Sequence, residues 1–170
     1  MNNTPKDRSK PTASRVITTP IGKLTLVASS QGLQQIIFGA KKLRMSRNVS
    51  TNAENHLIQT ERQLHEYFVG ERKKFSISLD ISGSVFQESV WYALKKIGYG
   101  QTISYAQQAK LVRKPKAFRA VGSANGKNPV AIILPCHRVI ASSGTLGGYG
   151  GGLTVKRKLL ELEKKFSEAE

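Results

Sequence analysis

A short run around position 136 combines the side-chain types that nucleophilic chemistry needs. Cys136, His137 and Arg138 follow Pro135 at the end of an apolar stretch. The thiolate is the reactive form of cysteine, and neighbouring cationic groups lower the pKa of a thiol below its usual value of about 8.5. A lone cysteine in an apolar run is more often buried filler, but a filler position does not require rigid and charged neighbours. The run therefore predicts Cys136 as a nucleophile with a lowered pKa.

The adjacency of Cys136 and His137 limits the chemistry open to that nucleophile. Neighbouring side chains of an extended segment point to opposite faces, so the thiol and the imidazole can cooperate only through a local turn or a bridging water. A cysteine hydrolase would need a direct Cys–His pair and an oxyanion hole, which argues against that class. The chain has one cysteine and three scattered histidines, so we expect no disulfide, no metal and no cofactor.

The charge balance indicates a polyanionic partner. Among 170 residues, 27 Lys and Arg stand against 11 Asp and Glu, which gives a formal net charge of +16. Such a surplus favours phosphate contacts through counterion release, so nucleic acid is the first candidate and an anionic membrane surface the second. No run approaches the roughly 18 apolar residues of a membrane span, and the N-terminus lacks the apolar core of a secretory signal. We expect a cytoplasmic protein, associated with the nucleoid in a bacterium or nuclear in a eukaryote, and no membrane partner.

The first half of the chain predicts a small β-rich domain at residues 15–82, preceded by a basic flexible tail at 1–14. Turn signals separate three β-rich runs, and a loop, a helical stripe and an alternating apolar run follow. These elements are expected, in that order, at residues 15–18, 23–28, 33–38, 39–55, 56–69 and 75–81. The last of them predicts a fourth strand.

The second half, residues 83–170, predicts a mostly helical domain, so the fold class is α+β. Two capping boxes, Ser84 to Gln87 and Ser104 to Gln107, each open a helix. A proline suited to a first helical turn opens a third helix, and an amphipathic stripe predicts a last one. The four helices are expected at residues 84–97, 104–112, 115–124 and 155–166.

The helices expected at 104–112 and 115–124 are close enough in sequence to form a helix-turn-helix. Five cations and no acid fall in this region, namely Lys110, Arg113, Lys114, Lys116 and Arg119. An ordinary helical hairpin with a solvated basic face is the alternative. The second helix is rich in small residues, Ala117, Ala120 and Gly122, and poor in the long polar side chains that read base edges. Docking in the minor groove therefore fits this helix better than reading of the major groove.

Several motifs of the second half together resemble the O6-alkylguanine-DNA alkyltransferases, also called methylated-DNA–protein-cysteine methyltransferases. The matching stretches are Phe86–Trp91, Tyr99–Tyr105, Pro115–Gly122, Asn128-Pro129, Pro135–Val139 and Gly147–Leu153. The resemblance is dense over residues 84–166 and only architectural over 15–82. It implies a ribonuclease-H-like N-terminal domain followed by a winged-helix-like domain for DNA binding and catalysis.

The resemblance also implies a DNA repair activity. The protein would rotate O6-alkylguanine, and also O4-alkylthymine, out of double-stranded DNA and transfer the alkyl group to Cys136. With no second thiol in the chain, disulfide chemistry cannot reverse the resulting thioether, so each molecule would act once. The expected partner is duplex DNA bound in the minor groove by a monomer, alone or cooperatively along the DNA.

The resemblance assigns roles to four residues beside Cys136. His137 would be the base, acting through a water, and Glu163 would orient His137. Tyr105 would donate a hydrogen bond to the guanine and assist its departure as an acid, which a neutral tyrosine can do because its usual pKa is about 10. Asn128 would fix the turn that leads into the Cys136 segment.

Further matches concern DNA binding and the substrate pocket. Arg119 would be a finger that fills the base stack after the nucleotide has rotated out. Other DNA contacts are expected at Ser104, Lys114, Lys116, Ala117, Ala120 and Gly122. The pocket is expected to use the carbonyl group of Val139 and a wall formed by Tyr149, Gly150 and Gly151.

Two residues depart from the family pattern. Phe118 stands where relatives often have alanine, and either packs inward or alters the fit to the groove. Gly150 stands where relatives often have serine or alanine, which enlarges or loosens the pocket.

A non-catalytic DNA-binding module is the rival hypothesis. The acceptor cysteine in its complete motif favours the reactive class.

Overall fold

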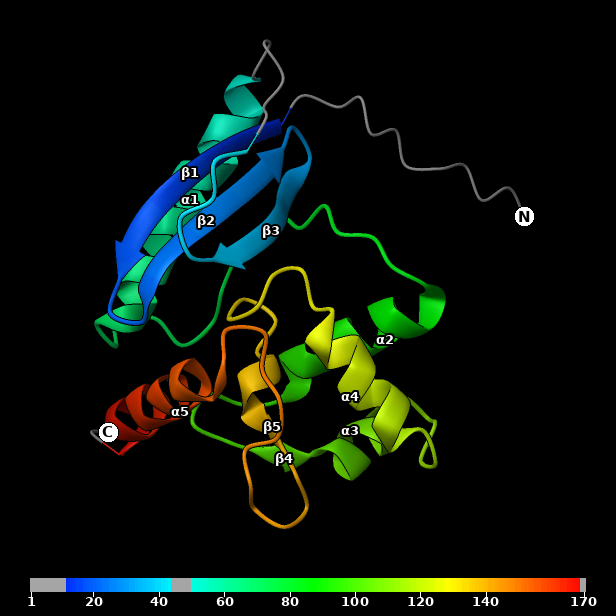
Figure 1. The fold of residues 1–170 in the computed structure, drawn as a ribbon. Helices are drawn as coiled ribbons and strands as arrows, with labels where there is room; N and C mark the ends of the chain where they lie inside the picture. Colours follow the sequence, from blue (N-terminus) through cyan, green and yellow to red (C-terminus); the bar gives the residue numbers. More distant parts are fainter. Residues whose placement is uncertain (1–11, 44–49, 169–170) are drawn as a thin grey trace.

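The computed structural model describes residues 12–43 and 50–168, which form two parts in contact (Figure 1). The N-terminal part is an antiparallel sheet of order β1-β2-β3 with one helix, α1, across one face. The bounds are β1 Thr12–Thr19, β2 Gly22–Ser29, β3 Gly32–Phe38 and α1 Thr51–Phe68. Residues 1–11 of the tail expected at 1–14 lie outside the described residues, whereas residues 12–14 are not a tail but the first residues of β1.

Two further expectations for this part need correction. Helix α1 begins at Thr51 and not at residue 56, because Ser50 caps it by accepting a hydrogen bond from the Ala53 backbone nitrogen. The run 75–81 is not a full strand, since only Leu79 makes a β-bridge, to Leu33. The Ser76 backbone is instead hydrogen-bonded at both its nitrogen and its oxygen by the Gln63 side chain of α1.

The C-terminal part contains the remaining helices and a two-stranded parallel sheet, β4 with β5. Both expected capping boxes are present, at Ser84 and at Ser104. The bounds are α2 Val85–Ala93, the 3-10 turn η1 Leu94–Lys96, β4 Ile103–Ser104, α3 Tyr105–Leu111, α4 Phe118–Gly126, the 3-10 turn η2 Cys136–Arg138, β5 Val139–Ile140 and α5 Leu153–Ser167.

Helices α2, α3 and α4 pack on one another around a small apolar cluster of Val90, Ala109, Val121 and Ala124. Hydrogen bonds between the side chains of Gln108 and Asn125 join α3 to α4. The expected helix at 84–97 stops at Ala93 and tightens into η1, and the one expected at 115–124 begins three residues late, at Phe118.

One hydrophobic core runs through both parts. It joins Leu24 and Leu26 of β2 and Leu64 of α1 to Leu134 and Leu159 of the C-terminal part. The segment that carries Cys136 belongs to the same core, so the sheet domain supports the chemistry-bearing turn directly. None of the helices in the described ranges has the length and hydropathy of a membrane-spanning segment.

Candidate active site

Cys136 begins the η2 turn and is 6% exposed. The local turn means that Cys136 and His137 are not successive residues of an extended strand. Asn128 ties this segment together, because its Nδ2 donates to the Leu134 carbonyl at 2.7 Å and lies 3.3 Å from the Cys136 sulfur. Its Oδ1 accepts from the Val130 backbone nitrogen at 3.1 Å. Asn128 therefore holds the turn and contacts the thiol.

Glu163 of α5 is fully buried and accepts five hydrogen bonds. Its Oε1 lies 2.7 Å from His137 Nε2, 2.8 Å from the Tyr67 hydroxyl and 2.9 Å from Arg138 Nη2. Its Oε2 lies 2.9 Å from Arg138 Nε and 3.0 Å from the Gly100 backbone nitrogen. A carboxylate only accepts, so the network places the imidazole proton on Nε2.

This network sets the charges of the pair. Burial raises the pKa of Glu163, but the hydrogen bonds and charges of His137 and Arg138 outweigh it and bring the pKa to about 2. Burial lowers the pKa of His137 more than the pairing with Glu163 raises it. The imidazole is therefore neutral at neutral pH. Its Nδ1 is buried and has no hydrogen-bond partner among the described residues, so this nitrogen is free to accept a proton.

The expectation of a lowered thiol pKa is wrong. Burial raises the pKa of Cys136 to about 11, and the Asn128 hydrogen bond and the charge of Lys156 only partly oppose it. The two residues expected to lower it cannot do so, because His137 is neutral and the charge of Arg138 is paired with Glu163. The resting thiol is protonated and needs a base at the moment of reaction.

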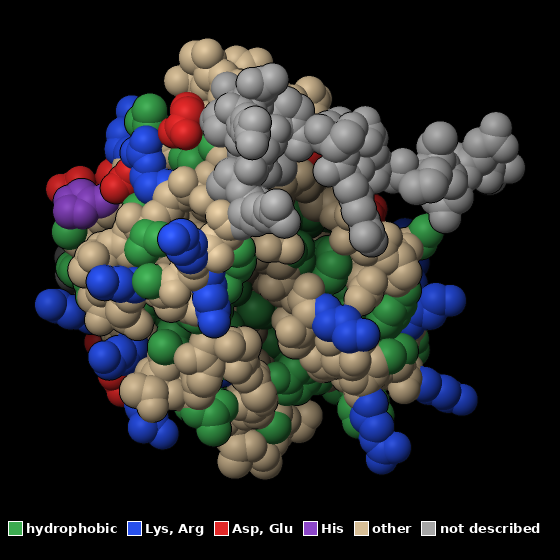
Figure 2. All heavy atoms as spheres, turned by 45° about the horizontal axis from the view of Figure 1, so that its top comes forward, with side chains coloured by type: hydrophobic (Ala, Val, Ile, Leu, Met, Phe, Trp, Pro, Cys, Tyr) green, Lys and Arg blue, Asp and Glu red, His purple; other side chains and the backbone are tan. Residues whose placement is uncertain are grey.

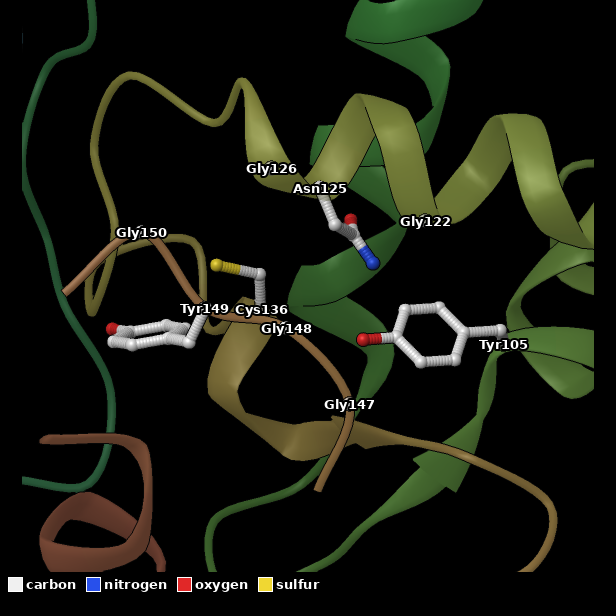
Figure 3. Close-up of a pocket in the computed structure, with 9 residues that line it drawn as sticks. All are labelled: Tyr105, Gly122, Asn125, Gly126, Cys136, Gly147, Gly148, Tyr149 and Gly150. Atoms are coloured by element: carbon white, nitrogen blue, oxygen red, sulfur yellow. The ribbon is translucent and has the colours of Figure 1, made fainter. Parts of the chain in front are cut away.

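A cavity of about 430 Å³ opens beside Cys136. Figure 3 shows the Tyr105 hydroxyl directed into it, with Asn125 of α4 on one side and the Gly147–Gly150 chain on the other. Burial and the nearby Cys136 raise the pKa of Tyr105, so its hydroxyl is a neutral donor. The lining residues are Tyr105, Gly122, Asn125, Gly126, Cys136, Gly147, Gly148, Tyr149 and Gly150. The volume suits a ligand the size of a nucleobase.

The wall of the cavity is mostly backbone. A Cβ atom placed on Gly150 would meet nothing within 4 Å, whereas one on Gly151 would lie 2.7 Å from the Phe38 ring of β3. The Tyr149 ring packs edge-on against Phe38, with the centroids 5.6 Å apart. Among the described residues the lining leaves out Gly151 and Val139, both expected there from the sequence.

Lys156 of α5 is a site residue that sequence reasoning missed. It is fully buried, and its Nζ donates to the carbonyl oxygens of Val139, Leu146 and Gly148. It therefore anchors the segment that becomes the cavity wall. The spacing of Lys156, Leu159 and Glu163 places them on one helix face, and this spacing is the sequence signal that could have indicated a buried Lys156. Tyr67 and Asn125 were missed as well.

The residues expected to contact DNA lie on α4 and the turn before it, except for Ser104, which ends β4 and caps α3. Arg119, Ala120, Lys114 and Lys116 are exposed, whereas Ala117, Ser104 and Gly122 are half-buried. Phe118 is 45% exposed, and its ring lies 5.7 Å from the Arg119 guanidinium, so it faces outward. Figure 2 shows Lys and Arg side chains projecting from much of one face, with a hollow near its centre. No group of three His, Cys, Asp or Glu in the described part could hold a metal ion.

Comparisons with known proteins agree with this arrangement. Residues 14–81 match the model of the 6-O-methylguanine DNA methyltransferase ribonuclease-like domain, and residues 85–165 match that of the DNA binding domain. The methylated-DNA–protein-cysteine methyltransferase of Methanosarcina acetivorans is 46% identical over 150 residues, covering 87% of this chain and 96% of the relative. That of Mycobacterium tuberculosis is 46% identical over 156 residues, covering 92% and 94%.

Solved structures similar to this chain come from the same family of proteins. The chain is similar to a crystal structure of Mycobacterium tuberculosis OGT in complex with DNA, with a TM-score of 0.81, 45% identity, and coverage of 90% of this chain and 93% of that one. A crystal structure of the O6-methylguanine methyltransferase of the same organism gives a TM-score of 0.77, 43% identity, and coverage of 94% and 96%. The expected α+β fold, a small sheet domain followed by a helical one, is confirmed. This chain belongs to the methylated-DNA–protein-cysteine methyltransferase family.

Proposed function

We propose that this protein repairs duplex DNA by moving the alkyl group of O6-alkylguanine, and of O4-alkylthymine, onto Cys136. The observation that carries the proposal is the position of Cys136. Its buried thiol borders a nucleobase-sized cavity and is followed directly by a neutral histidine held by a buried carboxylate. A base inside a duplex cannot reach such a thiol, so the damaged nucleotide must rotate out of the stack.

The transfer uses the residues in a defined order. His137 Nδ1 takes the thiol proton through a water, and Glu163 balances the charge of the imidazolium. The thiolate attacks the alkyl carbon, so that the S–C bond forms as the C–O6 bond breaks. The electron pair of the broken bond stays on the guanine, which leaves as an anion with a hydrogen bond from the Tyr105 hydroxyl and then takes up a proton. No step restores the thiol, so each molecule reacts once.

For DNA binding we propose that α4 docks in the minor groove of the duplex as part of a monomer. The small side chains of α4 let its backbone approach a narrow groove. Arg119 is exposed at its start and is suited to enter the stack, while Lys114 and Lys116 meet phosphates. Affinity should then fall steeply with salt. Arg119→Ala should weaken lesion binding more than Lys164→Ala, which alters an exposed lysine of α5.

The proposal is tested by intact mass and peptide mapping after the protein meets a duplex carrying O6-methylguanine. We expect one methyl group per molecule, located on Cys136, and none on Cys136→Ala. A duplex carrying O4-methylthymine tests the second lesion in the same way. Lesion binding without any change in mass would support the non-catalytic module instead.

A further inference from the structure

The structure assigns Tyr67 of α1 as a positioning residue for the His137–Glu163 pair, which makes the N-terminal domain part of the alkyl-transfer machinery. This inference rests on the proposed function, because it needs His137 as the base. Tyr67 and Glu163 lie 96 positions apart in the chain, one on the helix of the sheet domain and the other on α5.

The Tyr67 hydroxyl contacts the same Glu163 oxygen, Oε1, that binds the proposed base His137. The Tyr67 hydroxyl donates to Glu163 Oε1 at 2.8 Å, and the same oxygen accepts from His137 Nε2 at 2.7 Å. Tyr67, His137 and Glu163 are all fully buried, so water does not compete for these hydrogen bonds. The hydroxyl therefore helps to fix the direction from which Oε1 receives the imidazole proton.

The Tyr67 ring has little freedom to move. It packs edge-on against Phe68 and Tyr99, with centroids 5.3 and 6.0 Å away, and lies tilted against Phe75 at 5.4 Å. Burial and the charge of Glu163 raise the pKa of Tyr67 well above 10. The hydroxyl is thus a neutral, fixed donor throughout the physiological pH range.

Removal of this hydroxyl should affect both geometry and basicity. The carboxylate would keep both Arg138 hydrogen bonds and the Gly100 nitrogen, but Oε1 would lose one of its three donors. A carboxylate with fewer donors is more basic, so Glu163 would stabilise the imidazolium more strongly and the pKa of His137 would rise. The other titratable or charged groups that act on this pair are Arg138 on η2, Tyr99 before β4, Lys156 on α5 and Tyr149, whose ring packs edge-on against His137 with the centroids 6.4 Å apart.

The test compares Tyr67→Phe, which keeps the ring and its packing, with wild type. Tyr92→Phe, an exposed tyrosine of α2, is the matched control, and Glu163→Gln reports on the base itself. Single-turnover methyl transfer is measured against pH, together with affinity for the lesion duplex and thermal unfolding. We expect Tyr67→Phe to transfer about tenfold more slowly, as the loss of a hydrogen bond to a charged group predicts, with unchanged DNA affinity. In the plot of transfer rate against pH, the midpoint of the acid limb should move to higher pH for Tyr67→Phe. Tyr92→Phe should match wild type in rate, midpoint and DNA affinity.

The possible outcomes separate this inference from the proposed function. If Tyr67→Phe keeps the wild-type rate and midpoint while Glu163→Gln is slow, the positioning role is wrong and the proposed base stands. A slow Tyr67→Phe with an unmoved midpoint and weakened DNA binding would show a structural role only. If Glu163→Gln also transfers at the wild-type rate, both the proposed base and the role of Tyr67 are wrong.

Discussion

The two sides of Cys136 differ in how firmly they are held. On one side, Glu163 accepts five hydrogen bonds from Tyr67, Gly100, His137 and Arg138 in the protein interior. On the other side, residues 147–150 expose backbone to a cavity, and Gly150 has open space where a side chain would be. The hydrogen-bond network around Glu163 fixes its side chains in one arrangement, whereas the wall at residues 147–150 leaves space beside it.

The difference follows from what each region must do. A base acts only at hydrogen-bond distance from its proton, so the groups that hold it must be fixed. Under the proposed function the pocket receives a rotated nucleotide, and a wall rich in glycine leaves space for this large planar group. We therefore expect a substitution on one side of Cys136 to act mainly on that side.

The largest effect is expected from Glu163→Gln, which removes the charge that Arg138 and His137 share. Methyl transfer should fall about 100-fold or more, since general-base catalysis contributes at least that much. The free energy of unfolding should drop by about 3–5 kcal/mol, because a buried arginine loses its partner. Single-turnover kinetics and denaturant unfolding measure both. Glu161→Gln, on the exposed face of the same helix, should change neither.

The same hydrogen-bond network predicts that acid lowers the free energy of unfolding. The pKa of Glu163 is about 2 in the folded protein and about 4.5 when unperturbed. Its stabilisation is therefore complete above pH 4.5 and is lost as the pH falls through 2, by about 3 kcal/mol. His137 acts in the same direction, since its folded pKa lies below 6.5 and stability is lost as the pH falls below that value. Unfolding of wild type and Glu163→Gln across this range measures the contribution, and equal slopes would contradict it.

Lys156→Met tests how the two sides connect. Lys156 holds three carbonyl groups of the segment leading to the cavity wall. Its loss should slow transfer at limiting DNA by about tenfold through weaker capture of the lesion. The acid limb of the pH profile, which reports His137, should move much less than in Tyr67→Phe. Lys158→Met, an exposed change on the same helix, is the control, and an equal effect from it would refute the anchoring role.

The smallest effects distinguish two adjacent glycines. Gly150→Ala should leave transfer of a methyl group within about twofold of wild type, because the new methyl group meets nothing. Gly151→Ala should slow transfer several-fold and lower the melting temperature, because its Cβ would collide with the Phe38 ring. Transfer rates and thermal melts of the two variants give the comparison. The reverse order would mean that the wall closes in a way that this structure does not show.

The sequence predicts local features better than long-range ones. The capping residues Ser84 and Ser104 sit next to the helices that they start, so a local pattern was sufficient. The run 75–81 alternates like a strand, but its backbone is bonded by a glutamine side chain of α1, which no local pattern reveals.

Sequence reasoning about the site had the same limit. The resemblance led to His137 and Glu163, and the structure places them 2.7 Å apart. Neither Tyr67 nor Lys156 was singled out from the sequence, because their roles depend on their burial against distant segments. Burial also reversed the expected direction of the Cys136 pKa. These are tertiary effects, which depend on how the two domains pack.

The central claim is that the resting thiol of Cys136 is protonated and depends on the buried His137–Glu163 pair. Because the chain has one cysteine, thiolate absorbance measured against pH, with Cys136→Ala as the blank, reports this thiol alone. We expect no thiolate at neutral pH and a pKa of about 11 for Cys136. A thiol that ionises below pH 8 would contradict it, because a preformed thiolate needs no base.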